Sequence, residues 1–323
     1  MIVTLTPNPS LDRTLRVDLL ERGEVLRTEA ATVEAGGKGI NVARALHAGG
    51  YPVRAVLPSG GKEGDQLVAL LHEAGLWPSV VRIAGTIRAN TSIVEPDGTV
   101  TKLNEPGPRL GPDELEALLV AATSPPSTAT WVVGSGSLPP AVADTFFADL
   151  VARARTAGSR VAIDTSGSAR EAAIGAQPDL IKPNLDELVE VTGRRITTMA
   201  DAVDAARALQ EKTGGVVLAS LGAEGALLAD LDGVLHAESP VATPRSSVGA
   251  GDAMLAGYLS ASASDRITAL RTAVAYGAAA VALPGSQMPA PDTIRPERVR
   301  VTDQPAPERP LAPGTSPGPT ASP

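Results

Sequence analysis

The chain has 323 residues, of which 43% are hydrophobic and none is cysteine. This length and composition predict one large α/β domain or a domain with a subdomain, and the lack of cysteine excludes disulfides, zinc–thiolate sites and cysteine nucleophiles. The net charge of −8, with no run of Lys or Arg, argues against nucleic acid and against an anionic membrane as partner. No leader pattern is present and no stretch reaches the roughly eighteen apolar residues of a membrane span, so we expect a soluble, cytoplasmic protein.

The first strand is expected at Ile2–Thr6, a mostly β-branched run that ends at Pro7. Polar residues follow it directly, among them Asn8, Ser10 and Asp12. Ligands of open parallel sheets bind at the carboxyl ends of strands, so this position predicts a ligand site. The next segment, 16–34, alternates weakly and carries charge on both faces, which predicts exposed strands of a smaller sheet.

A glycine-rich loop then leads into a helix, because Gly36, Gly37 and Gly39 precede apolar residues at helical spacing. The loop is not a P-loop, since its spacing from glycine to lysine is wrong and no Ser or Thr follows Lys38. A plain tight turn is one interpretation. The cation of Lys38 and the amide of Asn41 favour the other, a binding loop for a phosphorylated, hydroxyl-rich molecule.

Between residues 51 and 108 the pattern is βαβ followed by hairpins. We expect a helix at 64–74 and strands at 53–57, 80–83, 89–95 and 99–104, with Asp97-Gly98 as a hairpin turn. The charged strands near Arg88 resemble segment 16–34, so both are assigned to one accessory sheet. Arg88 points either to solvent, which general statistics favour for a lone arginine, or into a cleft.

From residue 112 onward, helices and strands alternate with short connections, which predicts a mostly parallel, doubly wound sheet. The expected helices are 112–122, 141–157, 185–192 and 201–212, with further helices starting at Asp252 and Thr268. The expected strands are 131–134, 160–164, 180–182, 216–220, 226–230 and 234–237. Polar residues recur at the strand ends, as one site along the carboxyl edge would require. Beyond them, the proline-rich residues 303–323 are predicted to form a disordered tail.

The segment 243–259 contains the clearest anion site. Gly249, Ala250 and Gly251 allow main-chain N–H groups to turn inward where a helix begins, and helix N-termini attract phosphate. Asp252 lies beside these donors. Its carboxylate is either the N-cap of the helix or a base that accepts a proton from a substrate hydroxyl.

Read in order, the motifs GGKGIN, GSGSLP, KPNLDE, SLG and SSVGAGD make residues 1–302 resemble the PfkB (ribokinase-like) family of carbohydrate kinases. The opening TPNPSLDRT and the lysine of GGKG are most similar to its phosphosugar branch, which includes the 1-phosphofructokinases and tagatose-6-phosphate kinases. The resemblance implies a doubly wound, mostly parallel α/β sheet flanked by helices. It also implies a small β-sheet lid with strands from about 13–34 and 86–108, through which the family often forms dimers.

The resemblance also assigns roles to residues. Asp252 is the expected base, and Gly249, Ala250 and Gly251 form the anion hole for the transferred phosphoryl group. The expected sugar-phosphate contacts are Asp12, Gly37, Lys38, Asn41, Arg88 and Ser137, with Ser135 as an alternative to Ser137. The expected nucleotide contacts are Lys182, Asn184, Ser220, Gly222 and Ser247. Asn184 and Glu187 are expected to orient Mg²⁺ through water.

The implied activity is ATP- and Mg²⁺-dependent phosphorylation of fructose 1-phosphate to fructose 1,6-bisphosphate. Tagatose 6-phosphate and fructose 6-phosphate are the alternative acceptors, because Glu24 and Val25 stand where some relatives carry a phosphate-binding lysine. A non-catalytic sugar-phosphate sensor is a further alternative, although the base and the anion-hole residues are all present. A nicotinamide-dependent oxidoreductase is disfavoured, since no strand is followed by GxGxxG with the acidic residue that such a site needs.

Overall fold

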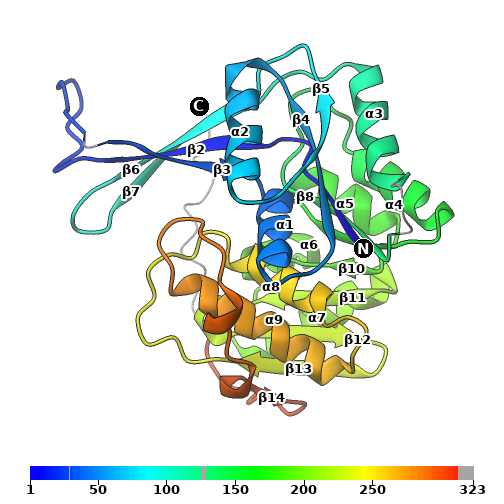
Figure 1. Ribbon diagram of the computed structural model, residues 1–323. Helices are drawn as coiled ribbons and strands as arrows, with labels where there is room; N and C mark the ends of the chain where they lie inside the picture. The colour runs from blue at the N-terminus through cyan, green and yellow to red at the C-terminus, as the bar shows by residue number, and fades with distance from the viewer. Residues whose placement is uncertain (29, 125–128, 312–323) are drawn as a thin grey trace. The chain divides into compact units, whose positions relative to one another are not determined.

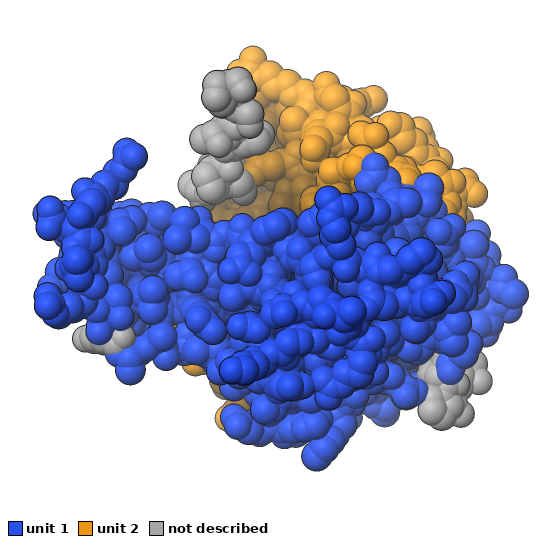
Figure 2. Space-filling model, turned by 90° about the horizontal axis from the view of Figure 1, so that it is seen from above, with its two compact units in different colours: residues 1–160 blue, residues 161–323 orange. Residues whose placement is uncertain are grey.

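The computed structural model describes residues 1–28, 30–124 and 129–311. The chain divides into two compact units, residues 1–160 and 161–323 (Figure 2). Both units combine a β-sheet with α-helices (Figure 1). Within the described ranges, no helix has the length and apolar character needed to cross a membrane.

The main sheet of unit 1 has four parallel strands in the order β8-β1-β4-β5. These strands are β1 (Ile2–Leu5), β4 (Val53–Ser59), β5 (Ser79–Arg82) and β8 (Trp131–Ser135). The helices of the unit are α1 (Lys38–Ala48), α2 (Gly61–Glu73), α3 (Pro112–Thr123) and α4 (Phe146–Thr156). All of β1 is buried, which explains its continuous apolar character, since helices such as α1 pack against a parallel sheet.

A smaller sheet of unit 1 has the order β3-β2-β6-β7. Its strands are β2 (Ser10–Arg16), β3 (Thr32–Gly36), β6 (Arg88–Val94) and β7 (Val100–Asn104). Three of them extend well beyond helix α1 in Figure 1. Strands β2 and β6 pair in parallel, so Asp12 lies opposite Asn90, and the other pairs are antiparallel. The predicted accessory sheet is therefore present, although none of the described residues between 17 and 31 belongs to a strand.

The strands of unit 2 follow the order β14-β13-β12-β11-β10-β9. They are β9 (Arg160–Asp164), β10 (Leu180–Ile181), β11 (Val216–Ser220), β12 (Ala226–Asp230), β13 (Gly233–Glu238) and β14 (Arg300–Thr302). The first three are parallel and the last three pair antiparallel. The helices are α5 (Gly167–Gly175), α6 (Leu185–Thr192), α7 (Met199–Thr213), α8 (Ala250–Ser260) and α9 (Arg266–Val281), with single 3₁₀ turns at η1 (Gly222–Glu224), η2 (Pro291–Thr293) and η3 (Pro296–Arg298).

The predicted α/β class is confirmed. One predicted helix start is wrong, and two elements were not predicted. Helix α4 begins at Phe146 instead of residue 141, because Ala141 adopts a left-handed conformation (φ 66°) that a helix does not tolerate. Helix α5 was not predicted, since its buried face is made largely of alanines, which give a weak hydrophobic period. Strand β14 was not predicted either, because its three residues are too few to show an alternating pattern.

The segment 303–311, which we assigned to a disordered tail, packs on unit 2. Leu311 is only 6% exposed and joins an apolar cluster with Leu188, Met199 and Leu209. Its main-chain N–H donates to the carbonyl of Thr197 at 2.9 Å. The prediction is therefore wrong for 303–311, where one leucine and main-chain pairing compensate for the high proline content. Residues 312–323 of the predicted tail lie outside the described residues.

Candidate active site

The predicted anion loop of unit 2 lies at the start of α8. Gly249 is the N-cap residue and adopts a left-handed conformation (φ 77°), which glycine accepts without strain. Asp252 lies in the first helical turn and is 7% exposed. The N-cap interpretation of Asp252 is therefore wrong. Its buried carboxylate instead lies at the positive end of the helix dipole, where negative charge is stabilised.

A buried ion pair lies beside this loop. Lys182, directly after β10, places its Nζ 3.0 Å from Oδ2 of Asp164, at the end of β9. Both side chains are at least 95% buried. A Cβ at Gly251 would lie 3.1 Å from the same Nζ, so the ammonium group lies against the glycine loop. Helix dipole and lysine together give this loop the positive potential that a phosphate requires.

The segment after Lys182 forms the start of α6. Asn184 is the N-cap, its side chain accepts a hydrogen bond from the N–H of Glu187 at 2.8 Å, and the Glu187 carboxylate accepts one from the N–H of Asn184 at 2.9 Å. The other Glu187 oxygen lies 3.2 Å from Nη1 of Arg170, a buried arginine of α5 that also pairs with Glu190. This capping box and the arginine together fix the Glu187 carboxylate.

The SLG loop is joined to the same segment. Ser220 ends β11, forms a bridge with Asn184 and donates its main-chain N–H to Pro183 O at 3.0 Å. Gly222, with φ 62°, begins the turn η1. The structure therefore brings together the KPNLDE and SLG motifs, as predicted. Ser247 is exposed in the loop before α8, where its carbonyl oxygen lies 3.4 Å from the N–H of Ala250.

In unit 1, Asp12 is the centre of a polar network at the start of the small sheet. Its Oδ1 accepts hydrogen bonds from Ser10 Oγ at 2.7 Å and from Asn90 Nδ2 at 3.0 Å. A Cβ at Gly36 would overlap the Asp12 carboxylate, so only glycine leaves this carboxylate in place. Two neighbouring strands thus fix the orientation of Asp12.

The GGKGIN loop begins helix α1, as predicted. Gly37 is the N-cap with φ 125°, and a Cβ there would lie 2.8 Å from Cγ2 of Thr6. No side chain caps this helix, and its first turn holds no acidic residue. Lys38 is the first helical residue, and Asn41 is buried at 6% exposure. This helix start is a second place in the chain with N–H donors and local positive charge.

Arg88 is half-buried at the start of β6. Its guanidinium donates to the main-chain oxygens of Asn8 and Glu105, at 3.2 Å each. Burial lowers the pKa of Arg88 from its ordinary value, and the charges of Asp12 and Glu105 oppose that shift. The fully solvated interpretation is therefore wrong.

Several buried polar atoms around Arg88 have no hydrogen-bond partner among the described residues. They are Nε of Arg88, Oδ1 of Asn8 and Oδ1 of Asn90. Buried polar atoms are nearly always paired in native proteins, so a polar ligand at this cluster would satisfy atoms that the described chain leaves unpaired. Ser137 is exposed and accepts a 3.3 Å hydrogen bond from Asn8 Nδ2, which ties the GSGSLP loop to the same cluster.

Sequence reasoning missed Asn90 and Arg170. Asn90 stands two residues after Arg88 on a strand and so shares its face, a signal that could have identified it. Arg170 gave no signal, because the helix that carries it was not predicted. Asn8 was noted as a polar residue at a strand end but received no role, and Asp164 at the end of β9 received none either.

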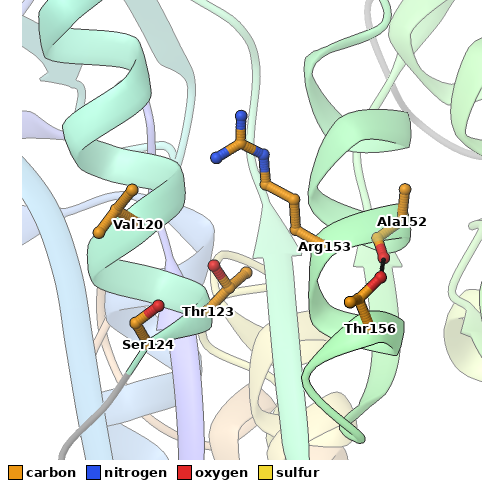
Figure 3. A pocket seen from close by; sticks show the side chains of 6 residues that line it. All are labelled: Val120, Thr123, Ser124, Ala152, Arg153 and Thr156. Carbon is orange, nitrogen blue, oxygen red and sulfur yellow. Dashed lines mark hydrogen bonds between the residues drawn. The ribbon is translucent and has the colours of Figure 1, made fainter.

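A separate open pocket of about 300 Å³ lies between α3 and α4 (Figure 3). Its lining residues are Val120, Thr123, Ser124, Ala152, Arg153 and Thr156. None of them was predicted for the site, and Arg153 forms a two-pronged ion pair with Glu116 at 2.7 Å. The described residues also contain no group of three or more His, Cys, Asp or Glu arranged to hold a metal.

Comparison with known proteins identifies relatives of the chain. Residues 6–293 match the family model of the pfkB family carbohydrate kinases. The chain is 39% identical over 300 residues to a 1-phosphofructokinase of Rhodobacter capsulatus, covering 91% of this chain and 94% of the relative. It is 37% identical over 290 residues to an ATP-dependent 6-phosphofructokinase isozyme 2 of Mycobacterium tuberculosis, covering 88% and 85%.

Among solved structures, phosphofructokinase-2 from Escherichia coli in complex with potassium superposes with a TM-score of 0.86 at 33% identity. The match covers 91% of this chain and 96% of that enzyme. The chain therefore belongs to the pfkB family of carbohydrate kinases. It is an enzyme, and its reaction is of the phosphofructokinase type.

Proposed function

We propose that the protein transfers the γ-phosphoryl group of ATP to the 6-hydroxyl of fructose 1-phosphate, giving fructose 1,6-bisphosphate. The observation that carries the kinase mechanism is the anion site of unit 2, where Lys182 Nζ, the Gly249–Gly251 loop and buried Asp252 lie together. The choice of sugar is supported by the 39% identity to a 1-phosphofructokinase over 91% of the chain. The proposal includes a cytoplasmic location, with which the lack of cysteine is consistent.

The donor phosphates are proposed to bind at the start of α8. The main-chain N–H groups of Gly249, Ala250 and Gly251 would hold the oxygens of the transferred group, and Lys182 would neutralise their charge. Phosphoryl transfer needs mainly positioning and charge neutralisation, and these donors supply both without moving. Ser220, Gly222 and Ser247 would contact the rest of the nucleotide.

Asp252 is the proposed general base. It would accept the proton of the attacking hydroxyl, and its carboxylate lies in the first turn of α8, at the positive end of the helix dipole. Its burial limits competing access of water to the carboxylate.

Mg²⁺ would supply neutralisation of phosphate charge when bound with ATP. Asn184 and Glu187 are oxygen donors of the right type, but both already serve the capping box and Glu187 also pairs with Arg170. They fit an outer role, in which they accept hydrogen bonds from metal-bound water instead of coordinating the ion directly.

The acceptor sugar is proposed to bind in unit 1. Asp12, Gly37 and Asn41 would contact its hydroxyls, and Lys38, Arg88 and Ser137 would hold the phosphate that it already carries. The unpartnered polar atoms of Asn8, Arg88 and Asn90 support this, because a hydroxyl-rich ligand would satisfy them.

A specificity panel tests the proposal. Purified enzyme with ATP and Mg²⁺ should give the highest kcat/KM with fructose 1-phosphate, compared with fructose 6-phosphate and tagatose 6-phosphate. Preference for fructose 6-phosphate would favour the second candidate, which the 37% identity to a 6-phosphofructokinase supports. Sugar-phosphate binding without turnover on any of the three sugars would identify a non-catalytic sensor.

We also propose that two copies pair through the small sheet. Four large apolar side chains are exposed on it or on its connections, namely Leu19 (56%), Val25 (83%), Val100 (48%) and Leu103 (58%). Exposed apolar clusters on a sheet edge are typical of interfaces. Light scattering should give a dimer for the wild type and a monomer for Val100→Asp/Leu103→Asp, whereas an unchanged mass would refute this interface.

A further inference from the structure

Residues 303–311 run along the start of α7. The N–H groups of Met199 and Ala200 donate to the carbonyls of Arg309 and Pro307, at 2.9 and 3.0 Å, and Leu311 returns a hydrogen bond to Thr197. Thr198 and Pro310 form an antiparallel bridge. The segment is thus held by main-chain pairing, with Leu311 inserted in the apolar cluster beneath it.

Arg309 links this segment to two carboxylates. Its Nε lies 2.5 Å from Oε2 of Glu224, and its Nη1 pairs with Glu238, which also pairs with Arg300. The side chains of Arg309, Glu224 and Glu238 are 35%, 27% and 18% exposed, so water screens these pairs only partly. Both carboxylates attract the guanidinium group of Arg309.

Glu224 belongs to the turn that follows the SLG motif. The N–H of Glu224 donates to Leu221 O at 3.2 Å, and the N–H of Leu221 donates to Gly225 O at 2.8 Å, which closes the turn on itself. His236 Nε2 lies 2.7 Å from the Glu224 carbonyl oxygen. Main-chain bonds therefore close the turn, and Arg309 ties its one acidic side chain to the segment 303–311.

The same turn also contributes a side chain to an apolar cluster. Leu221 belongs to the apolar cluster that includes Leu311 and also Leu185, the first residue of α6. The segment 303–311 therefore contacts the turn after Ser220 through the Arg309–Glu224 ion pair, and it shares an apolar cluster with the turn through Leu311.

We propose that Arg309 is a positioning residue for the nucleotide: by holding Glu224 it fixes the turn 221–225 and, through it, Ser220 and Gly222. The inference rests on the proposed function, in which these two residues contact ATP. Arg309 is not among the residues proposed to contact the nucleotide or the sugar. The neighbouring charges raise the pKa of Arg309 and lower the pKa of Glu238, in both cases mainly through their mutual hydrogen bond, so the ion pair persists over the neutral range.

The test compares Arg309→Met with the matched control Arg300→Met, which removes an arginine from the same Glu238 but not from Glu224. Calorimetric titration with ADP should show affinity about threefold to tenfold weaker for Arg309→Met, the scale of partly screened ion pairs, and unchanged affinity for Arg300→Met. In steady-state kinetics KM for ATP should rise by the same factor, while KM for the sugar phosphate stays at the wild-type value. Arg309→Lys should restore part of the affinity, because an ammonium group can still pair with one carboxylate.

Glu224→Gln approaches the same contact from the other side and should also weaken ADP binding. It serves as the deciding variant if Arg309→Met does not fold. Wild-type ADP affinity in either folded variant would overturn the inference, as would an equal rise in both KM values, which indicates a general structural effect. A wild-type enzyme that binds ADP but phosphorylates none of the sugars would overturn the proposed function alone, and the ADP titrations would still decide the role of Arg309.

Discussion

The two units differ in how they satisfy the charged and polar groups of the site. In unit 2, charged side chains pair with one another, as Lys182 does with Asp164 and Arg170 with Glu187. In unit 1, Arg88 donates to two main-chain oxygens, and Asn8 and Asn90 keep buried oxygens without a partner among the described residues.

Under the proposed function, this difference predicts how each unit responds to its ligand. Paired charges keep their geometry in the free protein, so we expect the proposed nucleotide site of unit 2 to need little ordering when ATP binds. Unpaired buried polar atoms carry a desolvation cost that a ligand removes. We therefore expect the proposed sugar site of unit 1 to gain more stability from its ligand than the nucleotide site does.

Removal of the Lys182 side-chain charge tests the proposed nucleotide site of unit 2. Of the changes considered, it should have the largest effect on stability. Lys182→Met leaves the Asp164 carboxylate buried without its cation, and loss of one partner of a buried pair costs about 3–5 kcal/mol. Denaturant unfolding without ligands should show this loss. The double variant Lys182→Met/Asp164→Asn should recover most of the stability but no kinase activity, and a fully stable single variant would contradict the role of the pair.

Replacement of Asp252 tests its role in catalysis separately from any effect on the stability of the fold. Asp252→Asn keeps the shape of the side chain and removes the base, so kcat should fall at least about a hundredfold, the low end for a general base. The melting temperature should stay close to that of the wild type. Asp265→Asn, at the N-cap of α9, is the matched control and should leave both stability and kcat near the wild-type values, because asparagine and aspartate cap helices about equally well. Near-normal turnover in Asp252→Asn would remove Asp252 from the mechanism.

Replacement of Arg88 tests the proposed sugar-phosphate site of unit 1. Arg88→Met should weaken binding of the phosphorylated sugar by about 1.5–3 kcal/mol, the scale of a hydrogen bond to a charged group, with KM for ATP unchanged. Its effect on stability without ligand should be smaller than that of Lys182→Met, since Arg88 is only half-buried. The exposed Arg82→Met serves as control. An unchanged KM for the sugar phosphate in Arg88→Met would show that Arg88 does not bind the substrate.

The smallest expected effect is on acid stability in unit 2. The hydrogen bond from Arg309, aided by Arg300, lowers the pKa of Glu238 below 4.5 in the folded chain. The stabilisation is therefore complete above about pH 4.5 and is lost as the pH falls through the lower folded pKa. Glu238→Gln should reduce the free energy of unfolding at pH 7 by at most about 1 kcal/mol and reduce its further loss on acidification. Parallel pH curves for the two proteins would contradict this linkage.

Local signals were enough for most of the elements. The glycines that precede α1 and α8 mark both helix starts, because positive φ at Gly37 and Gly249 requires glycine. Strand β1 and the turn at Asp97-Gly98 also follow from short stretches of sequence. Segment 303–311 could not be predicted in this way, since its composition argues for disorder and its main-chain partners Thr197, Met199 and Ala200 lie about a hundred residues earlier in the chain.

The sequence by itself determined the α/β class, the positions of both glycine loops and the family to which the chain belongs. The tertiary structure decided which groups meet: Lys182 with Asp164, Arg170 with Glu187, Arg309 with Glu224, and Asp12 with Asn90. It also decided that Asp252 is a buried first-turn residue and not an N-cap. The physical reason is that helix starts depend on neighbouring residues, whereas ion pairs depend on strand order and register, which bring together side chains that are distant in the chain.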